Sequence, residues 1–202
     1  MPKQHNLYID GQWTAGDAYV DNVSPSDAND VIGVYAQANP SQVEAALQAA
    51  NRAVLDWGDS PLESRFQMLM AIGNELIERS AELGELLARE EGKTRAEGIG
   101  EVYRSGQFFH YFAGEVHRQI DDRAESVRPG VEIDTRREPV GVVAIISPWN
   151  FPMATAVWKI APALAFGNAV IFKPANLVPA SAWALTEIIS RQEALPPGTF
   201  NL

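Results

Sequence analysis

Apolar residues recur at intervals of three or four along most of residues 39–118, and this spacing predicts a series of amphipathic helices. The first helix is expected to begin at Asn39-Pro40, because asparagine can cap a helix and proline fits its first turn. Gly58 is suited to end this helix. Its apolar face is expected to contain Val43, Leu47, Ala50 and Val54.

Three further helices are predicted in the same region. The segment Ser60-Pro61-Leu62-Glu63 matches a capping box and predicts the start of the second helix. Ser80 is expected to cap the third helix, which ends near Gly92. A fourth helix is expected over about residues 95–118. The apolar stripes on these helices are interpreted as surfaces for helix packing, not as cofactor sites.

Shorter segments have the spacing of strands. Residues 7–13 are expected to form a hairpin around Asp10-Gly11, because this pair suits the left-handed positions of a tight turn. Residues 31–36 predict another short strand. The alternation of apolar and polar side chains over residues 131–137 predicts a half-exposed strand.

The pattern changes again near residue 140. Residues 140–146 are almost wholly apolar and rich in β-branched side chains, which predicts a strand buried on both faces. A helix, a second strand, a second helix and a third strand are expected at about residues 153–166, 169–172, 179–191 and 199–202. This βαβαβ order predicts an α/β fold: N-terminal helices followed by the first, incomplete part of a doubly wound parallel Rossmann-like sheet. The open edges of such a sheet predict missing sequence or a partner chain.

Composition and charge narrow the possible functions. The 16 Lys and Arg residues against 26 Asp and Glu residues give a formal net charge of -10. An acidic surface repels nucleic acid and anionic lipid, so neither nucleic acid nor a membrane is expected as a partner. Without a signal peptide or an apolar run of about 18 residues, a cytoplasmic location is expected.

Metal and thiol chemistry are not expected from these residues. The chain has no cysteine, which excludes disulfides, thiolate metal sites and a cysteine nucleophile within it. The three histidines, His5, His110 and His117, are widely spaced. His110 and His117 could share a helix face, but two imidazoles without a third ligand do not predict a metal site, and none is expected.

The segment from Ile146 to Pro152 is the first candidate for chemistry. It follows a predicted buried strand and precedes a helix, which is where open α/β sheets bind ligands. Two prolines stiffen the loop, so the side-chain amide of Asn150 could serve as a fixed donor to a developing oxyanion. From the residues alone, a rigid proline turn in which Asn150 satisfies local backbone groups remains an alternative.

The segment from Phe172 to Asn176 is the second candidate. Lys173 at the end of the next strand could bind sugar hydroxyls or a phosphate. A solvated lysine at a strand end is the alternative that these residues leave open.

Taken together, these motifs resemble the aldehyde dehydrogenase superfamily. The segments SPWNFP, WKIAPALAFGNAVIFKPAN, VPASAWALTEIIS and LPPGTFNL carry the resemblance, with YIDGQW, EEGK and YFAGE before them. They occur in family order over essentially all 202 residues. The segment KPANLVPASAWALTEII is most similar to the semialdehyde group, which includes 2,5-dioxopentanoate dehydrogenases.

The resemblance implies roles for individual residues. Asn150 matches the side-chain donor that steadies the oxyanion, and Lys159 matches a helix lysine with a supporting relay role. Lys173 matches the lysine that binds the adenosine ribose. The positions beside that ribose match Ala175 and Asn176. The loop that lies along the dinucleotide matches Ile146, Ser147, Pro148 and Trp149. The implied coenzyme is NAD or NADP, and the implied substrate is a small-molecule aldehyde or semialdehyde.

The chain departs from the family pattern in two respects. Many members have glutamate where Asn176 stands, and a carboxylate there repels a 2′-phosphate whereas an amide does not. An intact protein of this type is therefore expected to accept NADP as well as NAD. The family's glycine-rich turn after the third strand, its general base and its cysteine nucleophile have no match here, so the chain is expected to be inactive alone.

The resemblance also implies a division of the chain. Residues 1–202 are expected to be the N-terminal part of an NAD(P)-binding domain, with the catalytic domain absent. Its expected parts are a hairpin and helical segment (1–120), an oligomerisation-type strand (121–138) and the βαβαβ unit (139–202). The second part resembles the family's oligomerisation ribbon and implies a homo-oligomer. Two alternatives are a non-catalytic, truncated coenzyme-binding or assembly protein and an unrelated Rossmann-like domain.

Overall fold

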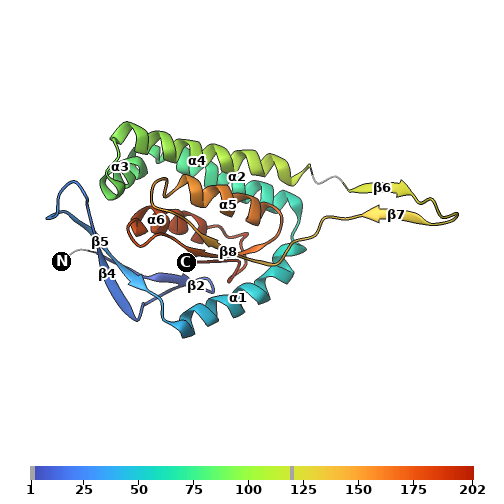
Figure 1. The fold of residues 1–202 in the computed structure, drawn as a ribbon, viewed down its shortest axis with the longest axis horizontal. Helices are drawn as coiled ribbons and strands as arrows, with labels where there is room; N and C mark the ends of the chain where they lie inside the picture. The colour runs from blue at the N-terminus through green and yellow to red at the C-terminus, as the bar shows by residue number, and fades with distance from the viewer. Residues whose placement is uncertain (1–2, 119–120) are drawn as a thin grey trace.

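The computed structural model describes residues 3–118 and 121–202 (Figure 1). Residues 1–2 lie outside the described residues, and so does residue 120, the expected boundary between the helical segment and the oligomerisation-type strand. The strands are β1 (Gln4–His5), β2 (Leu7–Ile9), β3 (Gln12–Thr14), β4 (Ala18–Val23), β5 (Val31–Gln37), β6 (Asp122–Glu125), β7 (Glu132–Thr135), β8 (Val142–Ile146), β9 (Ala169–Lys173) and β10 (Phe200–Asn201). The helices are α1 (Pro40–Gly58), α2 (Leu62–Glu78), α3 (Ser80–Glu91), α4 (Arg95–Val116), α5 (Ala154–Ala165) and α6 (Pro179–Ser190).

The last three strands form a parallel sheet in the order β10-β9-β8, with α5 and α6 as the crossovers. This confirms the predicted βαβαβ unit. Helix α1 packs against the same strands from the other side, and α2, α3 and α4 form an outer layer over α5 and α6 (Figure 1). The core therefore lies between the sheet and the helices on its two faces, where Ile145, Val170 and Phe200 are buried.

Several element ends follow the local sequence signals. Asn39 caps α1 in a reciprocal capping box with Gln42. Asp10 and Gly11, with φ of 52° and 76°, form the turn of the β2–β3 hairpin. Gly92 ends α3 in the left-handed conformation, with φ of 89°. These positions confirm the expected hairpin, the expected start of α1 and the expected end of α3.

The buried face of α1 differs from the expected one. Val43 is 53% exposed and Leu47 is also exposed, so the expectation of a core face at these positions is wrong. The buried residues of α1 are Ala46, Ala49, Ala50, Ala53 and Trp57. Small side chains let the helix backbone approach the sheet closely, and the Trp57 indole donates a buried hydrogen bond to the Leu164 carbonyl (3.1 Å). Alanine contributes little to an apolar periodicity, which explains why the sequence pattern predicts a different buried face of α1.

The two serine caps are also wrong. Neither α2 nor α3 has a side-chain hydrogen bond at its cap position. The Ser60 hydroxyl instead donates to the Trp57 carbonyl (2.6 Å) and accepts from Arg65 (2.8 Å). Arg65 is buried and needs hydrogen-bond acceptors, so the Ser60 oxygen binds its guanidinium and does not cap the helix. Ser80 lies inside α3 because α2 and α3 are joined at Arg79 with almost no intervening loop.

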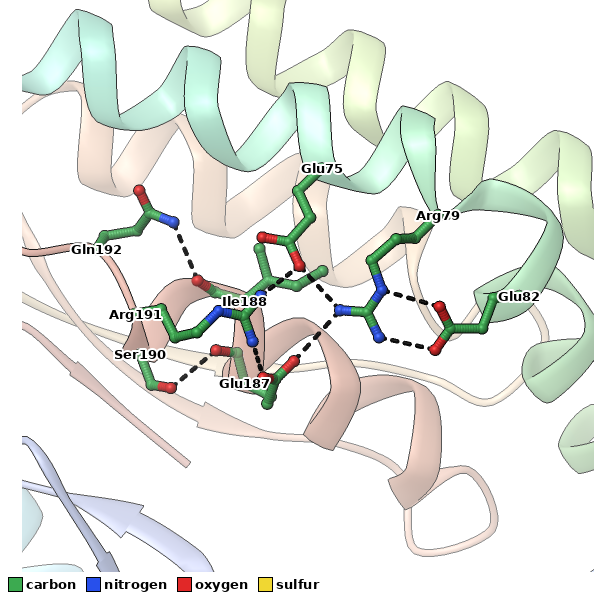
Figure 2. A network of polar contacts seen from close by, with 8 residues as sticks. All are labelled: Glu75, Arg79, Glu82, Glu187, Ile188, Ser190, Arg191 and Gln192. Carbon is green, nitrogen blue, oxygen red and sulfur yellow. Dashed lines mark hydrogen bonds and ion pairs between the residues drawn. The ribbon is translucent and has the colours of Figure 1, made fainter.

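An ion-pair network joins the outer helices to α6 (Figure 2). Arg79 pairs with Glu75 and Glu82, both at 2.8 Å, and with Glu187 on α6 at 3.4 Å. Arg191 pairs with both Glu75 and Glu187. Burial alone would raise the pKa of Glu75, but the hydrogen bonds from Arg191 and Arg79 outweigh burial and hold that pKa below its usual value. The network fixes α6 against the α2–α3 junction.

Strands β7 and β8 are more exposed than the sequence predicts. Every residue of β6 and β7 is exposed, because this antiparallel ribbon extends away from the rest of the chain (Figure 1). The half-exposed strand expected at residues 131–137 is therefore wrong in its burial. Strand β8 buries Ile145, but Ala144 and Ile146 on its opposite face are exposed, Ile146 to 71%. The expectation of a strand buried on both faces is therefore wrong. Among the described residues, no helix is long and apolar enough to cross a membrane.

Candidate functional site

The two candidate loops leave the sheet side by side. Ile146 and Lys173 are paired in the register of the parallel strands β8 and β9. The Ser147 amide donates a hydrogen bond to the Lys173 carbonyl at 3.3 Å. We call residues 146–150 the first corner and residues 173–176 the second corner. Both corners lie at the carboxyl ends of neighbouring parallel strands, which is the edge where open α/β sheets bind ligands.

The first corner presents mostly exposed side chains. Trp149 is 57% exposed, and Pro148 and Asn150 are exposed beside it. Ser147 is buried, and its hydroxyl has no hydrogen-bond partner among the described residues. A buried hydroxyl without a partner is costly, so a polar ligand at this corner would satisfy it.

The turn between α3 and α4 holds the first corner. The Lys93 ammonium donates to the Asn150 carbonyl (3.3 Å) and lies 4.3 Å from the centre of the Phe151 ring. It also pairs with Glu101 at 2.5 Å and with Glu91 at 3.0 Å. Burial alone would lower the pKa of Lys93, but the hydrogen bonds to Glu101 and Glu91 outweigh burial and raise that pKa. Lys93 is therefore a charged group throughout the neutral pH range.

Glu101 connects this turn to the start of α5. One carboxylate oxygen accepts from the amides of Met153 (3.0 Å) and Ala154 (3.1 Å), and the other accepts from Lys93. The start of the helix that follows the first corner is thus fixed by a side chain from α4.

The second corner borders a cavity of about 310 Å³. The Lys173 ammonium donates to the Asn176 side-chain oxygen (2.9 Å), and both side chains are exposed, whereas Ala175 is half-buried. All three residues line the cavity, together with Tyr35 and Trp183. Residues 146–150 lie outside its lining, so the cavity extends from the second corner only.

A buried glutamate holds the start of α6, which follows the second corner. Glu90, at the end of α3, accepts from the amides of Ala180 and Ser181, from the Ser181 hydroxyl (2.6 Å) and from the Asn22 side chain (2.8 Å). Asn22 also donates to the Leu177 carbonyl (3.4 Å). Burial raises the pKa of Glu90 to about 7, against the lowering effect of these hydrogen bonds.

Lys159 is not brought to either corner. It is exposed on α5, and its ammonium donates to the Thr155 carbonyl of the same helix (2.8 Å). Among residues 3–118 and 121–202, no group of three His, Cys, Asp or Glu residues is placed to hold a metal ion. His117 instead lies 3.6 Å from Glu63.

Sequence reasoning missed the residues that hold the corners. Glu90 and Lys93 belong to the EEGK segment, which contributes only to the family resemblance, and Glu101 lies in no motif. Glu101 binds amides 52 and 53 positions away, and Glu90 binds amides 90 and 91 positions away. The available signal was a charged cluster around the Gly92 helix end, but local sequence does not identify such distant partners.

Comparison with known proteins shows the same similarity along the whole chain. A sequence model described as the aldehyde dehydrogenase family matches residues 13–202. Alpha-ketoglutarate semialdehyde dehydrogenase of Haloferax volcanii is 36% identical over 197 residues, which cover 96% of this chain and 41% of that protein. Lactaldehyde dehydrogenase of Escherichia coli is 34% identical, with 100% of this chain and 42% of that protein covered.

Solved structures show the same likeness. Betaine aldehyde dehydrogenase from Staphylococcus aureus in complex with NAD+ matches with a TM-score of 0.94 at 32% identity, covering 98% of this chain and 40% of that chain. A 3,6-anhydro-L-galactose dehydrogenase in complex with NAP matches with a TM-score of 0.92 at 29% identity, covering 98% of this chain and 42% of that one. The chain spans about two fifths of the length of these relatives.

Proposed function

Because the chain belongs to the aldehyde dehydrogenase family, we propose that it supplies part of the NAD(P) site and the oxyanion donor of an enzyme that oxidises an aldehyde or semialdehyde to the carboxylate. One observation carries the proposal: the two corners meet at the ends of β8 and β9 through the Ser147–Lys173 hydrogen bond. Residues 1–202 form the N-terminal part of the coenzyme-binding domain in this proposal.

The residues at this edge fit a dinucleotide. The second corner offers an ammonium and an amide beside a cavity, which suits ribose hydroxyls. The first corner offers the exposed Ile146 and Trp149 surfaces and the unpartnered Ser147 hydroxyl. Lys173, Ala175 and Asn176 would hold the ribose, and residues 146–149 would lie along the dinucleotide. The nicotinamide of a bound coenzyme would accept hydride from the substrate.

Asn150 is the residue we assign to the reacting carbonyl. Its exposed side-chain amide is a neutral donor, and the loop that carries it is held by Lys93. Such a preorganised donor stabilises charge that develops on the carbonyl oxygen. The nucleophile of this chemistry is a thiolate, and these 202 residues contain no cysteine. We therefore propose that they do not oxidise aldehydes alone. Lys159 is left with a supporting role at most, because its ammonium is bound to its own helix.

Coenzyme binding tests this proposal directly. Calorimetric titration of the purified protein with NAD+ is expected to give binding that Lys173→Met weakens by about tenfold, the effect of one charged hydrogen bond. Arg104→Met, which removes an exposed cation on α4, is the matched control and should leave the affinity unchanged. Equal affinities for the wild type and Lys173→Met would contradict the assignment of the second corner.

We also propose that Asn176 permits NADP as well as NAD. The neutral amide does not repel a 2′-phosphate, whereas a carboxylate a few ångströms away would cost about 1–3 kcal/mol near a protein surface. Asn176→Glu is expected to weaken NADP+ binding at least tenfold more than NAD+ binding, and Asn176→Gln to change neither. Titrations with both coenzymes measure this. A wild-type affinity for NADP+ a hundredfold below that for NAD+ would overturn the proposal.

The exposed ribbon of β6 and β7 is the part we propose for homo-oligomer formation. Its strands pair only with each other among the described residues, and Ile133 is exposed on it. Light scattering on the wild type and on Ile133→Asp tests this. A wild-type protein that is monomeric at high concentration would refute it.

A further inference from the structure

Lys93, in the turn between α3 and α4, and Glu101, on α4, are two charged groups that the proposed chemistry does not use. The Lys93 and Glu101 side chains are only 11% and 3% exposed, and they form an ion pair. Buried charges are costly unless they are paired and hydrogen-bonded, so both groups need all their partners. Beyond each other and Glu91, their hydrogen-bond partners are backbone groups at Asn150 and in the residues that follow it.

The two groups hold that loop at two points, at Asn150 itself and at the start of α5. Lys93 binds the carbonyl of Asn150 itself and lies over the ring of Phe151. Glu101 binds the amides of Met153 and Ala154, where the loop becomes α5. The peptide that carries the Asn150 amide is therefore fixed at its own carbonyl and again within four residues.

We propose that Lys93 and Glu101 are positioning residues for the Asn150 amide. This inference rests on the proposed function. Neither group touches substrate or coenzyme; each acts through the backbone of the first corner. A donor that stabilises an oxyanion has to stay within a few tenths of an ångström of its working position, and a displacement of about 1 Å can cost about a hundredfold in rate.

Loss of the Lys93 ammonium has two separate effects: it removes the contact at the Asn150 carbonyl, and it leaves the buried Glu101 carboxylate without its cationic partner. Glu101 alone satisfies the buried amides at the start of α5. The Asn150 residue is exposed, so water can replace the ammonium at its carbonyl without leaving that carbonyl unpaired. Removing the ammonium thus frees the loop while the helix start keeps its acceptor.

A nuclear magnetic resonance experiment on the purified protein tests the positioning itself. The side-chain amide signals of Asn150 are assigned by their loss in Asn150→Asp. In Lys93→Met these signals are expected to shift and broaden. In Arg95→Met, which removes the neighbouring exposed cation paired with Glu85, they should not change. Unchanged Asn150 signals in Lys93→Met would overturn the inference.

Kinetics of the intact enzyme give the second readout. Lys93→Met is expected to lower kcat for aldehyde oxidation at least tenfold while the coenzyme affinity changes less than twofold, and Arg95→Met should change neither. If Lys93→Met does not fold, the same measurements are made on Glu101→Gln. Its amide oxygen can still accept from the Met153 and Ala154 amides, while the negative charge that pairs with Lys93 is lost. A wild type that oxidises no aldehyde refutes the proposed function but leaves the resonance test standing. An active enzyme with unchanged kcat in the folded variants refutes the inference.

Discussion

The buried carboxyl of Glu90 should make the stability of the protein depend on pH near neutrality. Burial raises its pKa from 4.5 to about 7. The folded chain therefore binds this proton more tightly than the unfolded chain, and the resulting stabilisation is complete below pH 4.5 and is lost as the pH rises through about 7. A shift of this size corresponds to roughly 3 kcal/mol, of which about 2–3 kcal/mol falls between pH 5 and 8.

Replacement of Glu90 by glutamine removes the titration and keeps the shape. The glutamine oxygen can still accept from Asn22 and Ala180, but its NH2 group faces the Ser181 amide, which loses its acceptor. That loss costs about 1–3 kcal/mol at every pH. The wild type should therefore be the more stable protein at pH 5, and its advantage should shrink by about 2–3 kcal/mol by pH 8.

Urea unfolding followed by tryptophan fluorescence at pH 5, 6, 7 and 8 measures the two free energies. Glu44→Gln, at an exposed glutamate on α1, is the matched control for the change in charge. An advantage of the wild type over Glu90→Gln that stays constant from pH 5 to 8 would refute the reasoning. It would mean that the four donated hydrogen bonds fully offset the burial of the carboxylate.

Two further predictions concern packing. Gly98→Ala should lower the free energy of unfolding by about 1–3 kcal/mol, because the added Cβ would lie 2.3 Å from the Gly84 carbonyl oxygen. Gly100→Ala, two residues along the same helix with open space around it, should raise stability by up to about 1 kcal/mol; thermal melts that rank the two variants the other way would contradict the packing of α3 on α4. Trp57→Phe should cost about 1–3 kcal/mol, because it removes the indole donor from the Leu164 carbonyl, which keeps its bond from the Gly167 amide, and puts a smaller ring at a fully buried position. A loss below 0.5 kcal/mol in urea unfolding, roughly the background of a neutral substitution, would count against that bond.

The sequence predicts the parts of the fold that depend on local rules. Asn39 caps α1 and Gly92 ends α3, because a side-chain oxygen and a glycine satisfy requirements of their own helix ends. The strand–loop pattern before Ser147 and Lys173 places both corners at one sheet edge, since parallel neighbouring strands end together.

The failures have non-local causes. Ser60 has the sequence of a cap, but Arg65 and the Trp57 carbonyl engage its hydroxyl. Ile146 is as apolar as Ile145, but the two side chains project from opposite faces of β8, and only the tertiary structure decides which face is covered. The support of the corners by Glu90 and Glu101 depends on helices that meet only in the folded chain.

The two glutamates also restrict where a coenzyme's charge can be placed. The amino-terminal ends of α5 and α6 carry partial positive charge and are the usual place for a phosphate in this kind of sheet. Here the amides at both ends already have an internal acceptor, the carboxyl of Glu101 at residues 153–154 and that of Glu90 at residues 180–181. A pyrophosphate bound at this edge must therefore find its donors away from both helix starts, and inorganic sulfate should not compete for them.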